Sequence, residues 1–196
     1  HGWLGTIFAE WEIIKNLKYR ISINGGIQDN INKKYEPSYV DFDASKAPRP
    51  AKGINERWTD RDWVIENTLN YSFTLADKHS FNALLGYTTQ SHTYEHMKGE
   101  ARGYANDNIT TLNAGTMYAL TSDESEYSMI SYLGRFNYVY DNRYMLTTTL
   151  RSDGSSRFGK NTKWGTFPSV SLGWRISQEK FMQNVKQISD LKIRAS

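Results

Sequence analysis

The sequence predicts an all-β fold, specifically an antiparallel transmembrane β-barrel segment of seven to eight strands. Three observations predict it: apolar and polar residues alternate, the connections are alternately short and long, and aromatic residues are common. Thirteen tyrosines and six tryptophans contribute to an aromatic fraction of 14%, although hydrophobic residues make up only 38% of the 196 residues. An excess of tyrosine and tryptophan suits a surface where lipid meets water.

The first half of the chain contains four alternating runs. Tryptophan, isoleucine, leucine, tyrosine and phenylalanine recur at every second position, and charged or hydroxyl side chains lie between them. Successive side chains of a strand point to opposite faces, so each run predicts a strand with one apolar and one polar face. The four runs are residues 3–13, 17–28, 63–75 and 81–88.

The second half predicts three more strands and the beginning of another. In residues 144–151, for example, Tyr144, Leu146 and Leu150 share one face, and Thr147 and Arg151 share the other. Between the last two strands, residues 178–189 change to helical spacing, with Ser177 as a plausible N-cap. The four runs are residues 127–140, 144–151, 168–177 and 191–196.

The connections fall into two classes that alternate along the chain. Short turns are predicted at 15–16, 76–78 and 141–143, whereas longer polar loops are predicted at 31–61, 92–125 and 152–165. Barrels of the outer membrane place short turns on the periplasmic side and long loops outside the cell. This pattern therefore favours a barrel wall with short periplasmic turns and long extracellular loops.

Amphipathic aromatic residues gather beside the short turns, as expected at a membrane interface. We expect the apolar faces near these turns to contact lipid through Trp11, Tyr19, Tyr71, Phe73, Phe81, Tyr140, Tyr144 and Trp174. A second interface is predicted farther along the strands, at Trp3, Trp63, Tyr87 and Tyr132.

Composition excludes several other classes. A net charge of +3, with scattered basic residues, is too small to indicate binding to nucleic acid. The chain has no cysteine, so it forms no disulfide or thiolate metal site. No run approaches eighteen apolar residues, which excludes a transmembrane helix but not membrane-spanning strands. Both ends fall inside alternating runs, and we expect residues 1–196 to be an internal fragment of a barrel.

Four ordered motifs resemble one family. They are GRFNYVYDNRYMLTTTLRSDGSSRFG (134–159), WGTFPSVSLGWRIS (164–177), EKFM (179–182) and ISDLKIRAS (188–196). Together these motifs resemble the SusC/RagA family of TonB-dependent outer-membrane transporters. The similarity is tight over about the last third of the chain and looser before it.

The resemblance implies a large barrel of about 22 strands with an N-terminal plug in its lumen. It further implies location in the cell outer membrane and import of oligosaccharides, peptides or similar nutrients. The implied partners are outer-membrane lipid, a SusD-like lipoprotein and the TonB complex, which would act through a plug region. Nothing in this sequence matches the plug or the N-terminal region, and the family implies no cofactor and no catalysis.

Three arginines on predicted polar faces are the candidate binding residues. In a barrel, Arg135, Arg151 and Arg175 face the lumen, where they would contact the plug or steer anionic substrate groups. Plug contact or simple solvation is the favoured role. Trp58, Tyr104 and Tyr118 in the long loops are candidates for stacking on sugars or for ordinary packing.

Catalytic and metal sites are weakly supported. His92 and His96 have ligand-like spacing, but they lie at a strand end and loop, so no metal site is predicted. The segment 153–157 is better explained as a turn than as a nucleophile site. Glu10, Glu12 and Glu66 lie on polar strand faces, so no catalytic residues are predicted.

The main alternative is a soluble, carbohydrate-binding β-sandwich of the lectin type. Such a module has a dry interior between two sheets, and it would contain the aromatic residues that the barrel exposes to lipid. A β-rich hydrolase is a third possibility, but the sequence contains no convincing set of acid, base and nucleophile.

Overall fold

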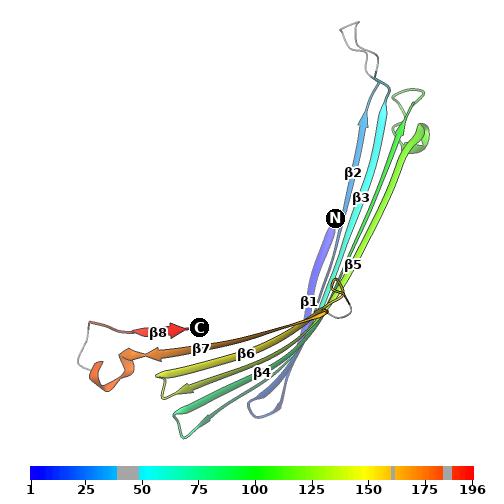
Figure 1. Cartoon of the computed structure of the whole chain (residues 1–196). Coiled ribbons are helices and arrows are strands. Elements are labelled where there is room, and N and C mark those ends of the chain that lie inside the picture. Colours follow the sequence, from blue (N-terminus) through cyan, green and yellow to red (C-terminus); the bar gives the residue numbers. More distant parts are fainter. Residues whose placement is uncertain (39–48, 160–161, 183–186) are drawn as a thin grey trace. The chain divides into compact units, whose positions relative to one another are not determined.

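The computed structural model describes residues 1–38, 49–159, 162–182 and 187–196. Within these ranges, eight strands form one sheet, in which each strand pairs with the next along the chain (Figure 1). The strands are β1 (Gly2–Ile14), β2 (Leu17–Glu36), β3 (Lys52–Leu75), β4 (His79–Arg102), β5 (Thr116–Tyr140), β6 (Tyr144–Ser155), β7 (Trp164–Arg175) and β8 (Lys192–Ala195). The prediction of an all-β, antiparallel sheet is confirmed.

Helical structure in these ranges is limited to three short 3-10 helices, η1 (Leu112–Ala114), η2 (Ile176–Gln178) and η3 (Lys180–Met182). No helix in the described part of the chain has the length and apolar character needed to cross a membrane. The predicted helix at 178–189 is therefore wrong over 178–182, where η2 ends and η3 follows. Residues 183–186 lie outside the described residues.

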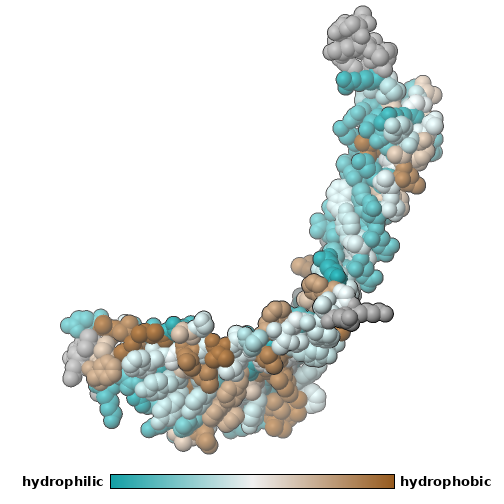
Figure 2. Space-filling view, in the orientation of Figure 1, coloured by the Kyte–Doolittle hydropathy of each residue, from teal (hydrophilic) through white to brown (hydrophobic). Residues whose placement is uncertain are grey.

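The chain divides into two compact units, which are treated separately below. Unit 1 contains residues 1–5, 25–62 and 92–126, and unit 2 contains residues 6–24, 63–91 and 127–196. Figure 2 shows a mostly hydrophilic surface over unit 1 and hydrophobic patches over unit 2.

Unit 2 contains the short turns, and their backbone explains why the chain reverses there. Asn16, Ala76, Asp77, Asp141 and Asn142 all have positive φ, between 48° and 69°. Tight hairpin turns require this left-handed conformation, which asparagine and aspartate tolerate better than most residues. The three short turns predicted from the sequence are present.

Ala76 is the poorest match between residue type and turn conformation, because its Cβ atom disfavours a φ of 50°. We expect Ala76→Gly to stabilise this hairpin by about 1 kcal/mol, since glycine removes the steric cost of the left-handed conformation. Hydrogen exchange at the ends of β3 and β4 measures the change. Asp77→Gly is the matched comparison, and a destabilised Ala76→Gly protein would contradict the explanation.

The sheet encloses almost no dry interior. Among the described residues, the only buried hydrophobic side chains are Ala51 and Ala101, and no large side chain is fully buried. Trp11 is 67% exposed, Tyr71 39% and Trp174 38%. The aromatic residues therefore do not form a protein core. The two-sheet sandwich does not agree with this structure, because all eight strands belong to a single sheet.

The predicted loops are longer than those observed. Residues 31–61 and 92–125 were expected to be irregular, but β2 continues to Glu36, β3 begins at Lys52, β4 ends at Arg102 and β5 begins at Thr116. Within the loop predicted at 152–165, β6 likewise continues to Ser155 and β7 begins at Trp164. The strands of unit 1 carry polar side chains on both faces, which removes the alternation used to detect a strand. Residues 39–48 and 160–161 lie outside the described ranges.

The loop between β4 and β5 packs against the strands of unit 1, where glycines leave room for larger side chains. A Cβ atom on Gly53 would overlap the Tyr104 hydroxyl, and one on Gly99 would lie 2.9 Å from Leu112 Cδ1. Tyr104 also contacts Tyr35 edge-on, with ring centroids 5.1 Å apart. These contacts hold the loop against β2, β3 and β4.

Candidate functional site

The aromatic face of unit 2 carries a continuous cluster beside the short turns. The Phe81 ring lies 4.8 Å from Phe73 and 4.9 Å from Tyr138, measured between centroids. His79 joins the cluster through a 2.8 Å hydrogen-bonding contact between its Nδ1 and the Tyr138 hydroxyl. We call this the turn-end aromatic cluster; its members are Tyr71, Phe73, His79, Phe81, Phe136, Tyr138, Tyr140 and Tyr144.

A second group of rings lies farther along the strands of unit 2. Tyr132 of β5 contacts Tyr87 of β4 and Trp164 of β7, with centroid distances of 5.4 Å and 5.8 Å. Trp63 of β3 is 43% exposed. The same side of the sheet thus carries aromatic rings at two levels, separated by aliphatic residues such as Leu85 and Val170, which are 61% and 56% exposed.

Glu179 organises the turn-end residues of β6 and β7, and sequence reasoning missed it. Its carboxylate accepts hydrogen bonds from the Tyr144 hydroxyl at 2.6 Å, Trp174 Nε1 at 3.0 Å and Arg143 Nη1 at 3.0 Å. The bonds from Tyr144 and Trp174 hold the pKa of Glu179 below its ordinary value, despite its burial. Its place in the EKFM motif was the one feature of the sequence that could have drawn attention to Glu179.

The predicted interface aromatics occupy different surroundings. Tyr71, Phe73, Tyr140 and Tyr144 belong to the turn-end cluster, whereas Trp174 is held by Glu179. The Tyr19 hydroxyl donates to Asn67 Oδ1 of β3 at 2.6 Å, and Trp11 on β1 is largely exposed. The Tyr144 hydroxyl and the Trp174 indole N–H thus find a polar partner while their rings stay exposed.

The opposite face of unit 2 carries a ladder of neutral polar side chains across four strands. Asn82 Nδ2 of β4 donates to Asn70 Oδ1 of β3 at 2.6 Å, and its Oδ1 accepts from Asn137 Nδ2 of β5 at 3.0 Å. Thr147 Oγ1 of β6 then donates to Asn137 Oδ1 at 2.8 Å. This polar face and the aromatic face confirm the two-sided strands predicted from the sequence.

The three predicted arginines have different surroundings. Arg151 Nε donates to both Asp153 oxygens, at 2.8 and 2.9 Å, and Arg175 Nη1 donates to Asn142 Oδ1 at 2.7 Å. The side chain of Arg135 is exposed and forms no hydrogen bond or ion pair with another residue that the structure describes. Its strand partner is Thr149, two residues before Arg151, whereas Arg175 pairs with Lys192 near the turns. The structure thus groups Arg135 with Arg151 and separates Arg175.

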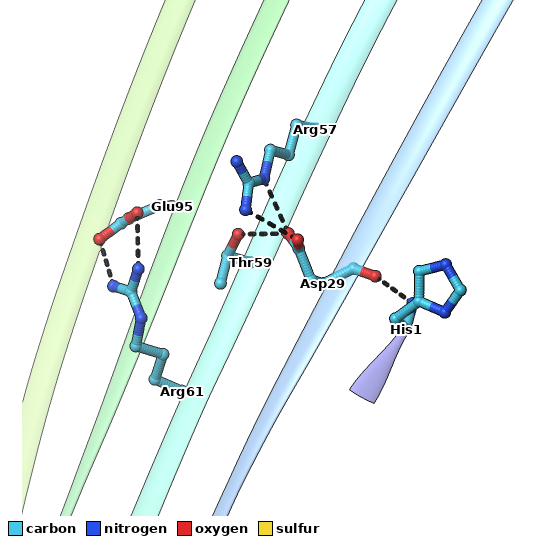
Figure 3. A network of polar contacts seen from close by, with 6 residues as sticks. All are labelled: His1, Asp29, Arg57, Thr59, Arg61 and Glu95. Carbon is cyan, nitrogen blue, oxygen red and sulfur yellow. Dashed lines mark hydrogen bonds and ion pairs between the residues drawn. The ribbon is translucent and has the colours of Figure 1, made fainter. Parts of the chain in front are cut away.

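Ion pairs join neighbouring strands of unit 1 (Figure 3). Asp29 of β2 accepts from Arg57 Nε and Nη2 of β3, at 2.8 and 2.7 Å, and from Thr59 Oγ1 at 2.8 Å. Arg61 of β3 pairs with both carboxylate oxygens of Glu95 on β4. These pairs join strands whose side chains are polar on both faces.

The ion pairs of unit 1 make its stability depend on pH. Hydrogen bonding by Arg57 lowers the pKa of Asp29 below its ordinary 3.8, and Arg61 lowers that of Glu95 below 4.5. A carboxylate with a lowered folded-state pKa stabilises the fold above its ordinary pKa, and this contribution is lost as pH falls through the folded value. The relevant window therefore lies below about pH 4.5.

We expect acidification from about pH 6 to about pH 3 to loosen the strands of unit 1. Hydrogen exchange, corrected for the intrinsic pH dependence of amide exchange, should show lower protection in β2 and β3. A protein with Asp29→Asn and Glu95→Gln should be less protected at the higher pH and change less on acidification. Equal protection of the unaltered protein at both pH values would contradict the assignment.

The histidines and glutamates considered earlier take part in local contacts. His92 Nδ1 lies 2.7 Å from Asp62 Oδ1, and His96 Nε2 lies 3.0 Å from Glu56 Oε1. Glu12 accepts from the Asn16 amide, Glu66 accepts from Ser22, and Glu10 pairs with Lys18. No cluster of three or more potential metal ligands occurs within the described ranges.

The loop aromatics are also used in packing. Trp58 lies within β3 and not in a loop, and Tyr104 packs against Tyr35. Tyr118 lies in β5, where the guanidinium carbon of Arg102 is 3.4 Å from its ring centroid. Asp153 lies within β6, which continues to Ser155, and it pairs with Arg151. The turn predicted at 153–157 is therefore wrong for 153–155, and a turn occurs at 156–157.

Relatives of known family match a large part of this chain. The chain is 41% identical over 138 residues to TonB-dependent receptor P39 of Formosa agariphila. The matched region covers 69% of this chain and 13% of the receptor. The chain is 44% identical over 105 residues to TonB-dependent receptor SusC of Bacteroides thetaiotaomicron, covering 50% of this chain and 10% of that receptor. This chain belongs to the SusC-like TonB-dependent receptors. No protein-family model matches it.

A solved structure supports the same fold for this SusC-like chain. The RagAB peptide transporter matches 97% of the chain with a TM-score of 0.90 and 24% identity, and the match covers 21% of the RagAB chain. The chain thus spans only a small part of the proteins that it resembles. The predicted family and barrel-type fold are confirmed.

Proposed function

We propose that this SusC-like chain forms part of the barrel wall of a TonB-dependent importer in the cell outer membrane. The exposed aromatic and aliphatic face of unit 2 carries this proposal, because the described residues provide no core to cover it. Two levels of aromatic rings flanking aliphatic side chains are typical of strands that cross a membrane.

The polar face supports the role of a wall around an aqueous lumen. The Asn70–Asn82–Asn137–Thr147 ladder satisfies its own hydrogen bonds, which suits a water-filled or plug-filled interior. Arg135 is the predicted arginine best suited to contact a plug or an anionic substrate group, because Arg151 and Arg175 already have partners. The wall guides passage, and we assign it no catalytic role.

The relatives support a proposal for the substrates and partners. RagAB is named a peptide importer, and SusC is named a TonB-dependent receptor. We propose oligosaccharides or peptides as substrates, a SusD-like lipoprotein as the extracellular partner, and coupling to TonB through a plug region. Residues 1–196 would then be one internal part of the barrel.

The orientation of the two faces can be tested at neighbouring positions of β7. Val170 lies on the aromatic side and Ser171 on the polar side, and residues 1–196 contain no cysteine. Val170→Cys and Ser171→Cys are made separately in the full-length receptor, labelled with a nitroxide and reconstituted in lipid vesicles. Oxygen concentrates in lipid and should relax the label at 170 more strongly than the label at 171. A water-soluble nickel chelate should instead relax the label at 171 more strongly.

These two positions act as controls for each other because they share the same strand and depth. Equal accessibility of both labels to the nickel chelate would contradict a lipid-facing aromatic side. A label at 170 that is shielded from both reagents would indicate contact with protein.

A further inference from the structure

A polar pocket in unit 1 lies between the ends of β2 and β3 and the loop that precedes β5. Its volume is about 570 Å³, within the range of pockets that hold small organic ligands. The lining residues come from three segments: Lys33, Lys34 and Tyr35; Ile54 and Asn55; and Thr110, Thr111, Leu112 and Asn113.

The walls of this pocket are fixed by contacts outside it. The Tyr35 hydroxyl donates to Asp107 Oδ1 at 2.8 Å, which joins β2 to the loop. The η1 turn is closed by a hydrogen bond from the Ala114 amide to the Thr111 carbonyl at 3.0 Å. Leu112 lies in the space left by Gly99. A ligand would therefore meet a preorganised site, with little ordering cost.

The charge of the lining selects against cations. No carboxylate lines the pocket, whereas two lysines do. Lys34 Nζ is neutralised by Glu36 at 2.6 Å, but Lys33 is exposed and forms no ion pair with any residue in the described ranges. Burial raises the pKa of Tyr35 to about 12, with a further contribution from Asp107, so this side chain stays uncharged. The pocket thus has one uncompensated positive charge.

The neutral part of the lining indicates more than a simple anion. Asn55, Asn113, Thr110 and Thr111 both donate and accept hydrogen bonds, as sugar hydroxyls do. The side chain of Leu112 offers apolar surface to the C–H face of a sugar ring. A bare phosphate or carboxylate would leave most of the 570 Å³ unfilled.

We propose that this pocket binds an acidic sugar unit, with Lys33 pairing with its carboxylate or sulfate and the amide and hydroxyl side chains bonding its hydroxyls. By strand alternation, Lys33 and Tyr35 lie on the side of β2 that carries Asp29, and Asn55 lies on the side of β3 that carries Arg57. His96 and Glu56 belong to the other side. Within unit 1, the pocket therefore lies on the side of the strands that carries the Asp29–Arg57 ion pair.

The test uses the full-length receptor in detergent, with a galacturonate disaccharide and the neutral galactose disaccharide as probes for calorimetry. The acidic probe should bind more tightly, and Lys33→Gln should weaken it about tenfold by removing one charge-assisted hydrogen bond. Asn113→Ala should weaken both probes. Lys15→Gln, the same charge change in a turn of unit 2, should leave binding unaltered.

Vesicles containing an acidic glycolipid form the second arm and distinguish the source of the sugar. If the receptor binds the vesicles but not the soluble disaccharide, and Lys33→Gln abolishes this binding, the proposal is supported with a membrane glycolipid as the source of the sugar. Binding of the soluble disaccharide, lost in the same variant, supports it with a free saccharide. Equal binding of neutral and acidic probes, binding unaffected by Lys33→Gln, or no binding in either arm would overturn it.

Discussion

Replacing Glu179 with alanine should make the amides of η2 and η3 exchange with solvent about tenfold faster or more. The Tyr144 hydroxyl, the Trp174 indole and the Arg143 guanidinium all lose a single shared acceptor. Arg143 would keep only Asp141 as an ion-pair partner in the described part of the chain. Local opening of η2 and η3 would follow, because Glu179 joins this segment to Tyr144 of β6 and Trp174 of β7.

Glu179→Gln separates the effect of the negative charge at position 179 from the effect of the hydrogen bonds that this side chain accepts. Glutamine can still accept from the Tyr144 hydroxyl and the indole, but it cannot neutralise Arg143, so its effect should lie between the unaltered protein and Glu179→Ala. Lys180→Ala changes the adjacent exposed residue and serves as the control. Unchanged exchange in Glu179→Ala would show that the three contacts contribute nothing to holding the turn.

Gly53→Ala should destabilise the loop before β5 by about 1–3 kcal/mol, the usual cost of overpacking. The added methyl group overlaps the Tyr104 hydroxyl, and the ring already packs closely against Gly115, where a Cβ atom would lie 2.9 Å from Tyr104 Cε2. The free energy of local opening of residues 103–115, from hydrogen exchange, measures the effect.

Tyr104→Phe should rescue much of that loss. The Tyr104 hydroxyl is buried and has no hydrogen-bond partner among the described residues, so its removal alone should be neutral or stabilising. In the double variant the nearest remaining ring atom, Cζ, lies 3.1 Å from the new methyl position. A coupling energy of about 1 kcal/mol or more is expected. Additive effects of the two substitutions would contradict direct contact.

The strands of unit 2 could be predicted because their signal is local. Phe136, Tyr138 and Tyr140 alternate with Arg135 and Asn137, and each hairpin turn carries asparagine or aspartate where φ is positive. Side-chain period and turn chemistry each depend on only a few neighbouring residues. The faces, the order of the strands and the short turns therefore followed from the residues.

The strands of unit 1 lacked that signal. Asp29 and Arg57 on one face and Glu56 and His96 on the other are all polar, so alternation vanishes while the backbone remains extended. The helical spacing after Ser177 was misleading for a related reason. A few apolar residues at intervals of three and four suggested a helix, but Glu179 fixes two 3-10 turns there.

By itself, the sequence determined the class of fold, the two-sided strands, the hairpin turns and the resemblance to SusC-like receptors, because each is written in neighbouring residues or in ordered motifs. Tertiary structure alone decided the length of the unit 1 strands, the partners of Arg151 and Arg175, the hub at Glu179 and the pocket beside Lys33. Those features join residues distant in the chain, such as Tyr35 with Asp107 and Tyr144 with Glu179. Only the strand register and the folded loop bring such groups within hydrogen-bonding distance.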